Sequence, residues 1–132
     1  MFEAKNIMAK EVFTVSPDSP IYDALKILID HGVSGLPVVD GDNNIRGIIS
    51  EKDMLKLLVN KDVSDNQTVA DYMSSEVKGF GPEDSAVDIC EFFINNPFRR
   101  VPIIENGKLA GVVSRRDIIS LILDIRNKSG NK

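Results

Sequence analysis

The sequence predicts an α/β (α+β) fold made of two β-α-β-β-α repeats that pack as pseudo-twofold partners in one module. The chain has 132 residues, of which 42% are hydrophobic and 27% charged, a balance typical of one globular module. One pattern also occurs twice, first at an offset of 65 residues and then, after a one-residue deletion, at 64. Matched pairs are Met8 with Met73, Pro37 with Pro102, Gly47 with Gly111, Ser50 with Ser114, and Asp53 with Asp117. Because about sixty residues bury too little apolar surface alone, we expect the two copies to share a core.

The first helix of copy one has start and stop signals. A short apolar strand is expected at residues 12–15. Ser19 is the expected N-cap and Pro20 the first helical residue, because the first turn of a helix does not need the N–H that proline lacks. The helix is expected to end at His31–Gly32, where glycine can adopt the left-handed conformation.

A hairpin and a second helix complete copy one. The apolar segments 36–39 and 45–49 are predicted strands, and the polar residues 40–44 form the turn between them. Ser50 and Asp53 then have the spacing of a capping box, which predicts a helix through Leu58.

Copy two repeats this order after a polar linker. Its expected elements are a strand near 77–80, a helix at 84–95, strands at 100–104 and 109–113, and a helix from 114 to about 125. The predicted division of the chain is repeat 1 at 1–60, a linker at 61–68, repeat 2 at 69–126 and a flexible tail at 127–132.

Composition excludes several classes of function. The formal net charge of −4 leaves no bulk positive field for nucleic acid or anionic lipid, so we expect neither nucleic acid nor a membrane as a partner. A single cysteine, Cys90, and an N-terminus without an apolar span predict a cytoplasmic protein. One His and one Cys leave no Cys/His metal cluster and no His-based triad, and no glycine-rich phosphate loop is present. We therefore expect neither an enzyme nor a metal site.

Each copy places a serine and an aspartate three residues apart where its last strand meets its last helix. The motifs are Gly47-Ile-Ile-Ser50-Glu-Lys-Asp53 and Gly111-Val-Val-Ser114-Arg-Arg-Asp117. They can be helix caps, which stabilise a helix by roughly 1 kcal/mol. They can also be ligand sites, because a helix N-terminus suits a phosphate and a carboxylate can accept both hydroxyls of a ribose. Chemistry alone slightly favours the cap.

In duplicate and in combination, these motifs resemble the tandem cystathionine-β-synthase (CBS) domain pair. The resemblance covers nearly the whole chain and includes Val12-Phe-Thr-Val-Ser-Pro17, Leu36-Pro-Val-Val39 and Val101-Pro-Ile-Ile104. It implies a non-catalytic regulatory module whose two clefts between the repeats hold an adenosyl ligand. AMP, ADP or ATP is favoured over S-adenosylmethionine and NAD(H).

The resemblance also implies that each cleft combines residues of both copies. The first cleft would use Ser50, Asp53, Val77, Lys78, Arg99, Arg100 and Arg116. The second would use Ser114, Asp117, Val12, Phe13 and Thr14, with Lys52 as its one cation. Ser34 and Gly35 stand where the first cleft has two arginines, so we expect a polyanion in the first cleft and a less charged ligand in the second.

The arginines have a plainer interpretation as well. Arg99–Arg100 can be a solvated pair at a strand end, and Arg115–Arg116 a helix-surface pair. Since neighbouring side chains of a strand point to opposite faces, we expect only one arginine of the first pair to face the cleft.

Two other features are expected to be structural. The segment 40–51 partly imitates a calcium loop, but Ile45 stands where that loop needs glycine, so a hairpin turn is predicted. Cys90 is expected to be a small apolar side chain in a helix, and His31 a helix-end residue.

We therefore expect a module that binds an adenine nucleotide, in an energy-sensing role, and signals the bound state to a regulated enzyme or transporter. The alternative is a dimerisation or protein-interaction scaffold with empty or vestigial clefts. The runs 54–59 and 118–125 make their helices apolar nearly all round, which predicts burial on more than one side. A homodimer is expected for that reason, and the resemblance implies one too.

Overall fold

The computed structural model describes residues 2–60 and 66–130 of the chain. Contacts divide the chain into two compact units. The β1–β2 unit comprises Phe13–Val77 and Gly107–Leu109, and the β3–β4 unit comprises Met1–Val12, Lys78–Asn106 and Ala110–Lys132. The linker predicted at 61–68 lies outside the described residues over 61–65, and so do residues 131–132 of the predicted tail.

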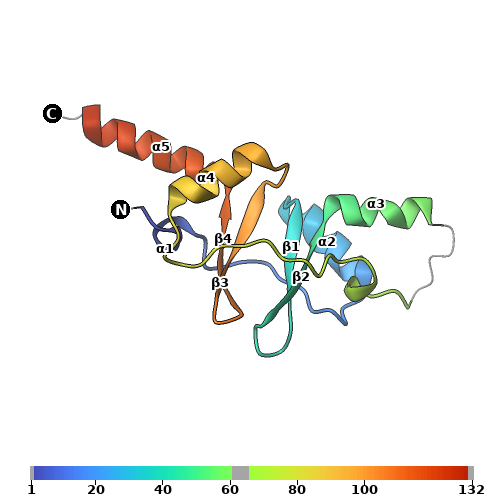
Figure 1. The fold of residues 1–132 in the computed structure, drawn as a ribbon. Helices are drawn as coiled ribbons and strands as arrows, with labels where there is room; N and C mark the ends of the chain where they lie inside the picture. Colours follow the sequence, from blue (N-terminus) through green and yellow to red (C-terminus); the bar gives the residue numbers. More distant parts are fainter. Residues whose placement is uncertain (1, 61–65, 131–132) are drawn as a thin grey trace. The chain divides into compact units, whose positions relative to one another are not determined.

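The β1–β2 unit is a two-stranded antiparallel sheet with two helices (Figure 1). Its elements are α2 (Ile21–His31), β1 (Gly35–Val39), β2 (Ile45–Ser50), α3 (Glu51–Val59) and the short 3-10 helix η1 (Val69–Asp71). Helix α2 ends as expected, because Gly32 adopts a left-handed conformation with φ 62° directly after His31. The core gathers the buried apolar side chains of all five elements, together with Val15.

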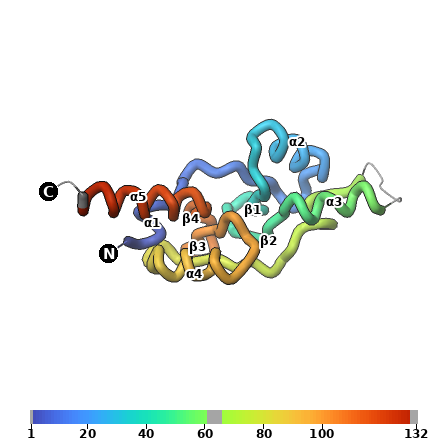
Figure 2. Tube along the Cα trace, turned by 90° about the horizontal axis from the view of Figure 1, so that it is seen from above, coloured from blue at the N-terminus to red at the C-terminus, as the bar shows by residue number. Residues whose placement is uncertain are grey.

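The β3–β4 unit repeats this arrangement. Its elements are α1 (Ala4–Ile7), α4 (Ala86–Asn95), β3 (Arg100–Glu105), β4 (Lys108–Ser114) and α5 (Arg115–Gly130). Figure 2 shows α1 lying beside α5. A second buried cluster, which includes Ala4, Ile89, Phe93 and Ile103, is the core of this unit.

Each hairpin pairs with a short segment from the start of the other repeat. Ala9, near the N-terminus, exchanges two backbone hydrogen bonds with Val112 of β4, at 2.9 and 3.0 Å. Ser74, at the start of repeat 2, does the same with Ile48 of β2, at 3.0 and 2.9 Å. We call the two segments that contain Ala9 and Ser74, residues 2–9 and 68–74, the straps. Each strap therefore belongs by contact to the unit of the other repeat.

A glycine lets each strap approach its strand. A Cβ atom at Gly47 would lie 2.6 Å from the Ser74 carbonyl oxygen, and one at Gly111 would lie 2.7 Å from that of Ala9. Both distances are shorter than a van der Waals contact allows. The matched glycines of the sequence repeat are thus explained by the close packing of the straps.

The structure differs from several sequence predictions. The opening strands predicted at 12–15 and 77–80 shrink to single parallel bridges, from Val15 to Val38 and from Phe80 to Ile103. The opening strands are short because of Pro37 in the β1–β2 unit and Pro102 in the β3–β4 unit. A proline has no N–H to donate to the next position of the ladder. The straps' short helices, α1 and η1, were not expected from the sequence.

Two helix boundaries also differ. Ser19 is not the N-cap of α2, because Pro20 occupies that position and the Ser19 hydroxyl accepts the N–H of Ser16 at 3.2 Å. Helix α5 runs to Gly130, so residues 127–130 of the predicted flexible tail are helical. Residues 126–129 contain neither proline nor glycine, so the sequence holds no stop signal before Gly130.

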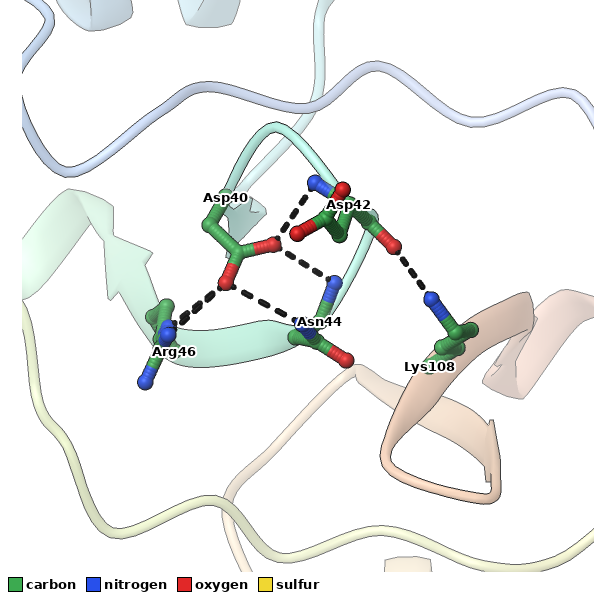
Figure 3. A network of polar contacts seen from close by, with 5 residues as sticks. All are labelled: Asp40, Asp42, Asn44, Arg46 and Lys108. Carbon is green, nitrogen blue, oxygen red and sulfur yellow. Dashed lines mark hydrogen bonds and ion pairs between the residues drawn. The ribbon is translucent and has the colours of Figure 1, made fainter.

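The turn between β1 and β2 is organised by one carboxylate (Figure 3). Asp40 accepts the N–H groups of Asp42 at 2.9 Å and Asn44 at 3.0 Å, and it pairs with Arg46 at 2.8 Å. Partial burial would raise the pKa of Asp40, but these hydrogen bonds outweigh it and lower that pKa to about 2. The predicted hairpin turn is confirmed, and the carboxylate that imitates a calcium ligand serves the turn instead.

The tip of the β3–β4 hairpin packs on this turn. Asn106 and Gly107 both have positive φ, at 54° and 79°, as a two-residue hairpin turn requires. The Gly107 carbonyl oxygen accepts the N–H of Ile45 at 3.0 Å, and the Lys108 ammonium donates to the Asp42 carbonyl oxygen at 2.7 Å (Figure 3). These contacts assign residues 107–109 to the β1–β2 unit.

Gly47→Ala should displace the strap around Ser74. The added methyl group would meet the Ser74 carbonyl oxygen and the Met73 sulfur, so we expect a loss of about 1–3 kcal/mol in the free energy of unfolding, measured with urea. Gly41→Ala is the control, because a Cβ atom there meets nothing within 4 Å. Equal stability of the two variants would contradict this account of the strap.

Asp40 should give stability a specific dependence on pH. Its pKa of about 2 lies below the ordinary 3.8, so its contribution is complete above about pH 5 and is lost as the pH falls from about 4 toward 2. In Asp40→Asn, the urea midpoint should fall less steeply over that range than in the wild type. The matched control is Asp42→Asn, because the Asp42 side chain accepts no hydrogen bond from any described residue. A wild-type slope in Asp40→Asn would refute the assignment.

Candidate functional site

The first candidate site is the corner where β2 meets α3. Ser50 is the N-cap of α3, and its hydroxyl accepts the N–H of Asp53 at 3.4 Å. In return, Oδ2 of Asp53 accepts the Ser50 N–H at 2.9 Å and the Ser50 hydroxyl at 3.0 Å. The predicted capping box is thus present.

The corner between β4 and α5 has the same geometry. Oδ2 of Asp117 accepts the Ser114 N–H at 2.8 Å and the Ser114 hydroxyl at 3.0 Å, and the Asp117 N–H donates to that hydroxyl at 3.2 Å. The serine and the aspartate of both corners are half-buried.

The cap uses only one oxygen of each carboxylate. Within the described parts of the chain, Oδ1 of Asp53 and Oδ1 of Asp117 accept no hydrogen bond. A carboxylate has about four acceptor positions on its two oxygens. The cap and the ligand site, which were alternatives on sequence alone, are therefore chemically compatible.

Each corner is tied to the residue that precedes the first strand of its hairpin. The N–H of Glu51 donates to the Ser34 carbonyl oxygen at 3.0 Å, and the N–H of Arg115 donates to the Arg99 carbonyl oxygen, also at 3.0 Å. The backbone of Arg99 thus lies directly against the Ser114–Asp117 corner. The equivalent place in the β1–β2 unit has no arginine.

The β3–β4 unit concentrates the predicted cationic residues. Arg99, Arg100 and Arg116 are all exposed, and none forms an ion pair or a side-chain hydrogen bond with a residue that the structure describes. Arg116 is also in the first turn of α5, where the helix dipole disfavours a positive charge. No described residue compensates these three cations, which favours an anionic ligand.

The remaining predicted residues are divided between the units. Phe13, Thr14, Val77, Ser50 and Asp53 belong to the β1–β2 unit, whereas Val12, Lys78, Ser114, Asp117 and the three arginines belong to the β3–β4 unit. Val12 and Val77 are partly buried, and Lys78 is exposed. The ligand-binding roles of these residues remain predictions.

Phe13 and Thr14, two residues predicted to bind a ligand, have different surroundings in the β1–β2 unit. The Phe13 ring stacks on the His31 ring with centroids 3.9 Å apart. Thr14 lines an open cavity of about 350 Å³, together with Ser16, Asp23 and Asp40. The sequence predicts His31 only as a helix-end residue, and no spacing in the sequence signals the ring contact.

The side chain of Arg115 has backbone partners. The Arg115 guanidinium donates to three backbone carbonyl oxygens, those of Phe93, Asn96 and Phe98. Arg115 is exposed, as the helix-surface interpretation of Arg115–Arg116 expects, but its charge lies at the carboxyl end of α4. Carbonyl groups left unpaired at a helix end attract such a cation, but the sequence does not show which helix end would be near.

The described residues include no helix that is both long and apolar enough to cross a membrane. They also include no group of three or more His, Cys, Asp or Glu side chains placed to hold a metal ion.

Comparison with known families decides what kind of chain this is. The CBS domain family matches it twice, over residues 4–60 and 69–124. This chain belongs to the CBS-domain family. The predicted resemblance and the predicted fold class of two CBS repeats are thereby confirmed. CBS pairs are generally regulatory and non-catalytic modules.

A curated relative and two solved structures illustrate the similarity. An uncharacterised 17.7 kDa protein of Acidianus ambivalens is 35% identical over 131 residues, which cover 98% of this chain and 79% of the relative. Other curated relatives are longer, and the chain spans 42% of one and 23% of another.

Both solved structures contain adenosyl ligands. CBSX2, known from Arabidopsis thaliana and crystallised with AMP, is 26% identical with a TM-score of 0.86, covering 96% of this chain and 99% of its own. The CBS domain pair of protein MJ0100, crystallised with 5′-methylthioadenosine and S-adenosylmethionine, is 25% identical with a TM-score of 0.79, covering 94% and 98%. Two CBS pairs with this fold were thus crystallised with adenosyl ligands.

Proposed function

We propose that this CBS pair is a non-catalytic regulatory module that binds AMP, ADP or ATP and passes the bound state to a partner protein. The observation that carries the proposal is the set of three exposed arginines, Arg99, Arg100 and Arg116, which no described residue compensates. A scaffold with empty clefts gives no reason to gather three uncompensated cations in one unit. A phosphate-bearing ligand does.

The chemistry divides between the corners and the arginines. A ribose offers two neighbouring hydroxyl donors, and Oδ1 of Asp53 or Asp117 is available to accept one while Oδ2 maintains the cap. Phosphates are acceptors only, so they suit guanidinium groups and the N–H groups of a helix N-terminus. The similarity to CBSX2, crystallised with AMP, supports the choice of an adenine nucleotide.

The assignment of residues to two ligands follows the family resemblance. One nucleotide would be held by Ser50, Asp53, Val77, Lys78, Arg99, Arg100 and Arg116, and a less charged ligand by Ser114, Asp117, Val12, Phe13 and Thr14. The two sets differ in charge by their arginines, so the first ligand should carry more phosphate. S-adenosylmethionine or NAD(H) is the alternative ligand class, and the MJ0100 structure supports keeping S-adenosylmethionine in the test.

We also propose that the module is a homodimer. Helices α3 and α5 leave equivalent apolar side chains exposed, because Leu55, Leu58 and Val59 match Ile119, Ile122 and Leu123 at an offset of 64. Leu58 is 93% exposed and Ile122 is 58% exposed. A second copy would cover these faces of α3 and α5 with the same faces of its own, as in an isologous interface. The proposed location of the protein is the cytoplasm, and the proposed partner that it regulates is an enzyme or a transporter.

Adenine nucleotides should raise the melting temperature. A ligand at 100 times its Kd stabilises the folded state by about 2.7 kcal/mol, which shifts the melting temperature by several degrees. A thermal-shift panel of AMP, ADP, ATP, GTP, NADH and S-adenosylmethionine should show the largest shift for one of the first three. Equal shifts for ATP and GTP, or none for any member, would contradict the proposal.

Two substitutions at Asp53 separate its roles. Asp53→Asn keeps a carbonyl oxygen for the cap but replaces the other acceptor with an NH2 donor, so nucleotide affinity should fall about tenfold or more with little change in stability. Asp53→Ala removes the cap as well and should cost roughly 1 kcal/mol of unfolding free energy. Calorimetric titration and urea denaturation measure the two effects. Wild-type affinity in Asp53→Asn would leave Asp53 with a structural role only.

A charge on the apolar helix faces should dissociate the dimer. Leu58→Glu and Ile122→Glu should lower the mass measured by light scattering at micromolar concentration from twice that of one chain to that of a single chain. Ile29→Glu is the matched control, because Ile29 is 79% exposed but lies on α2. A wild-type protein that stays monomeric at high concentration would contradict the homodimer.

A further inference from the structure

Arg115, the first residue of α5, clamps the loop that leads into β3. Its Nε donates to the Phe98 carbonyl oxygen at 2.8 Å, and its Nη2 donates to those of Phe93 at 3.0 Å and Asn96 at 2.9 Å. The guanidinium also lies 5.8 Å from the centre of the Phe93 ring. One side chain thus joins the last turn of α4 to the loop that follows it.

The clamped loop carries the arginines of the proposed anion site. Arg99 follows Phe98 directly, and its carbonyl oxygen accepts the backbone N–H of Arg115 at 3.0 Å. The Phe98 ring packs on Phe92 of α4, with centroids 5.8 Å apart and planes 7° from parallel. The loop before Arg99 and Arg100 is therefore fixed by the Arg115 side chain, the Arg115 backbone and one aromatic contact.

The other unit has the backbone part of this arrangement but not the clamp. Glu51 occupies the place of Arg115, and its N–H donates to the Ser34 carbonyl oxygen at 3.0 Å. A carboxylate cannot donate to carbonyl oxygens, and the Glu51 side chain makes no hydrogen bond within the described residues. The clamp thus occurs only in the unit that carries the arginine pair.

The arginines of this unit have different tasks. Three donor contacts to carbonyl oxygens at the carboxyl end of α4 occupy the charge of Arg115. Arg99 and Arg100 have no such partners among the described residues and are exposed. Holding their backbone in place reduces the conformational entropy that their loop loses when a ligand orders it.

We propose that Arg115 is a positioning residue that fixes Arg99 and Arg100 for phosphate and thereby sets the preference of the module for ligands with more phosphate groups. This inference rests on the proposed function, and it adds a residue that does not touch the ligand. Its specific consequence is a change in the ratio of affinities for ATP and for adenosine, because adenosine has no phosphate for the two arginines to hold.

Arg115→Ala, Arg115→Lys and Arg126→Ala test this consequence by calorimetric titration of the full chain with ATP, AMP and adenosine. Arg126→Ala is the matched control, because it removes one exposed positive charge from the same helix. The ratio of ATP affinity to adenosine affinity should fall about tenfold in Arg115→Ala. It should fall in Arg115→Lys as well, since an ammonium lacks the planar fork that reaches three carbonyls. It should stay within about twofold of wild type in Arg126→Ala.

The outcomes separate the two proposals. If the wild type binds ATP and both Arg115 variants keep its ATP-to-adenosine ratio, the positioning role is wrong and the proposed function stands. If Arg115→Ala does not fold, Arg115→Lys alone decides, because it keeps the charge and a donor. Titration of the wild type with inorganic tripolyphosphate tests the anion site without a nucleoside. If neither tripolyphosphate nor ATP binds, both proposals are wrong.

Discussion

The packing of each strap against the hairpin of the other repeat's unit is the constraint on which this structure depends. A two-stranded antiparallel sheet is marginally stable in water, and the two hairpins here obtain a neighbour from residues 2–9 or 68–74. Since each strap precedes the repeat that it does not pack against, neither repeat can complete its sheet from its own sequence. Gly47 and Gly111 are the positions at which this packing requires the smallest residue.

The corners lie at the ends of β2 and β4, two residues after Ile48 and Val112, with which the straps pair. There the serine and aspartate first serve the helix, because a helix N-terminus has unpaired N–H groups that a cap must satisfy. The cap takes Oδ2 of each aspartate and leaves Oδ1 to accept from a ligand. A residue pair that caps a helix therefore keeps an acceptor for a ribose hydroxyl, and we propose that the surrounding charges, rather than the cap, determine which ligands a corner accepts.

Much of this architecture could be predicted from the sequence. Hydrophobic spacing, Gly32 and the Ser50–Asp53 spacing located α2, β1, β2 and α3, because these signals act within a few residues. The straps were missed because their partners are remote in the sequence: the Ala4 N–H of α1 donates to the Asp84 carbonyl oxygen, and the Val69 N–H of η1 donates to that of Ser19. The roles of Pro37 in shortening the opening strand and of Arg115 in holding a loop were missed for the same reason, since each depends on a partner that is remote in the sequence.

The most direct test of this account is a nuclear magnetic resonance titration of the isotope-labelled chain with AMP. We predict that the amide signals of Ser50 and Asp53, and of Arg99 and Arg100, shift with one common saturation curve, while those of Leu58 in α3 and Ile122 in α5 do not. Saturable shifts that leave both groups of amides unchanged would contradict the central claim that the capped corner and the arginine pair bind the nucleotide.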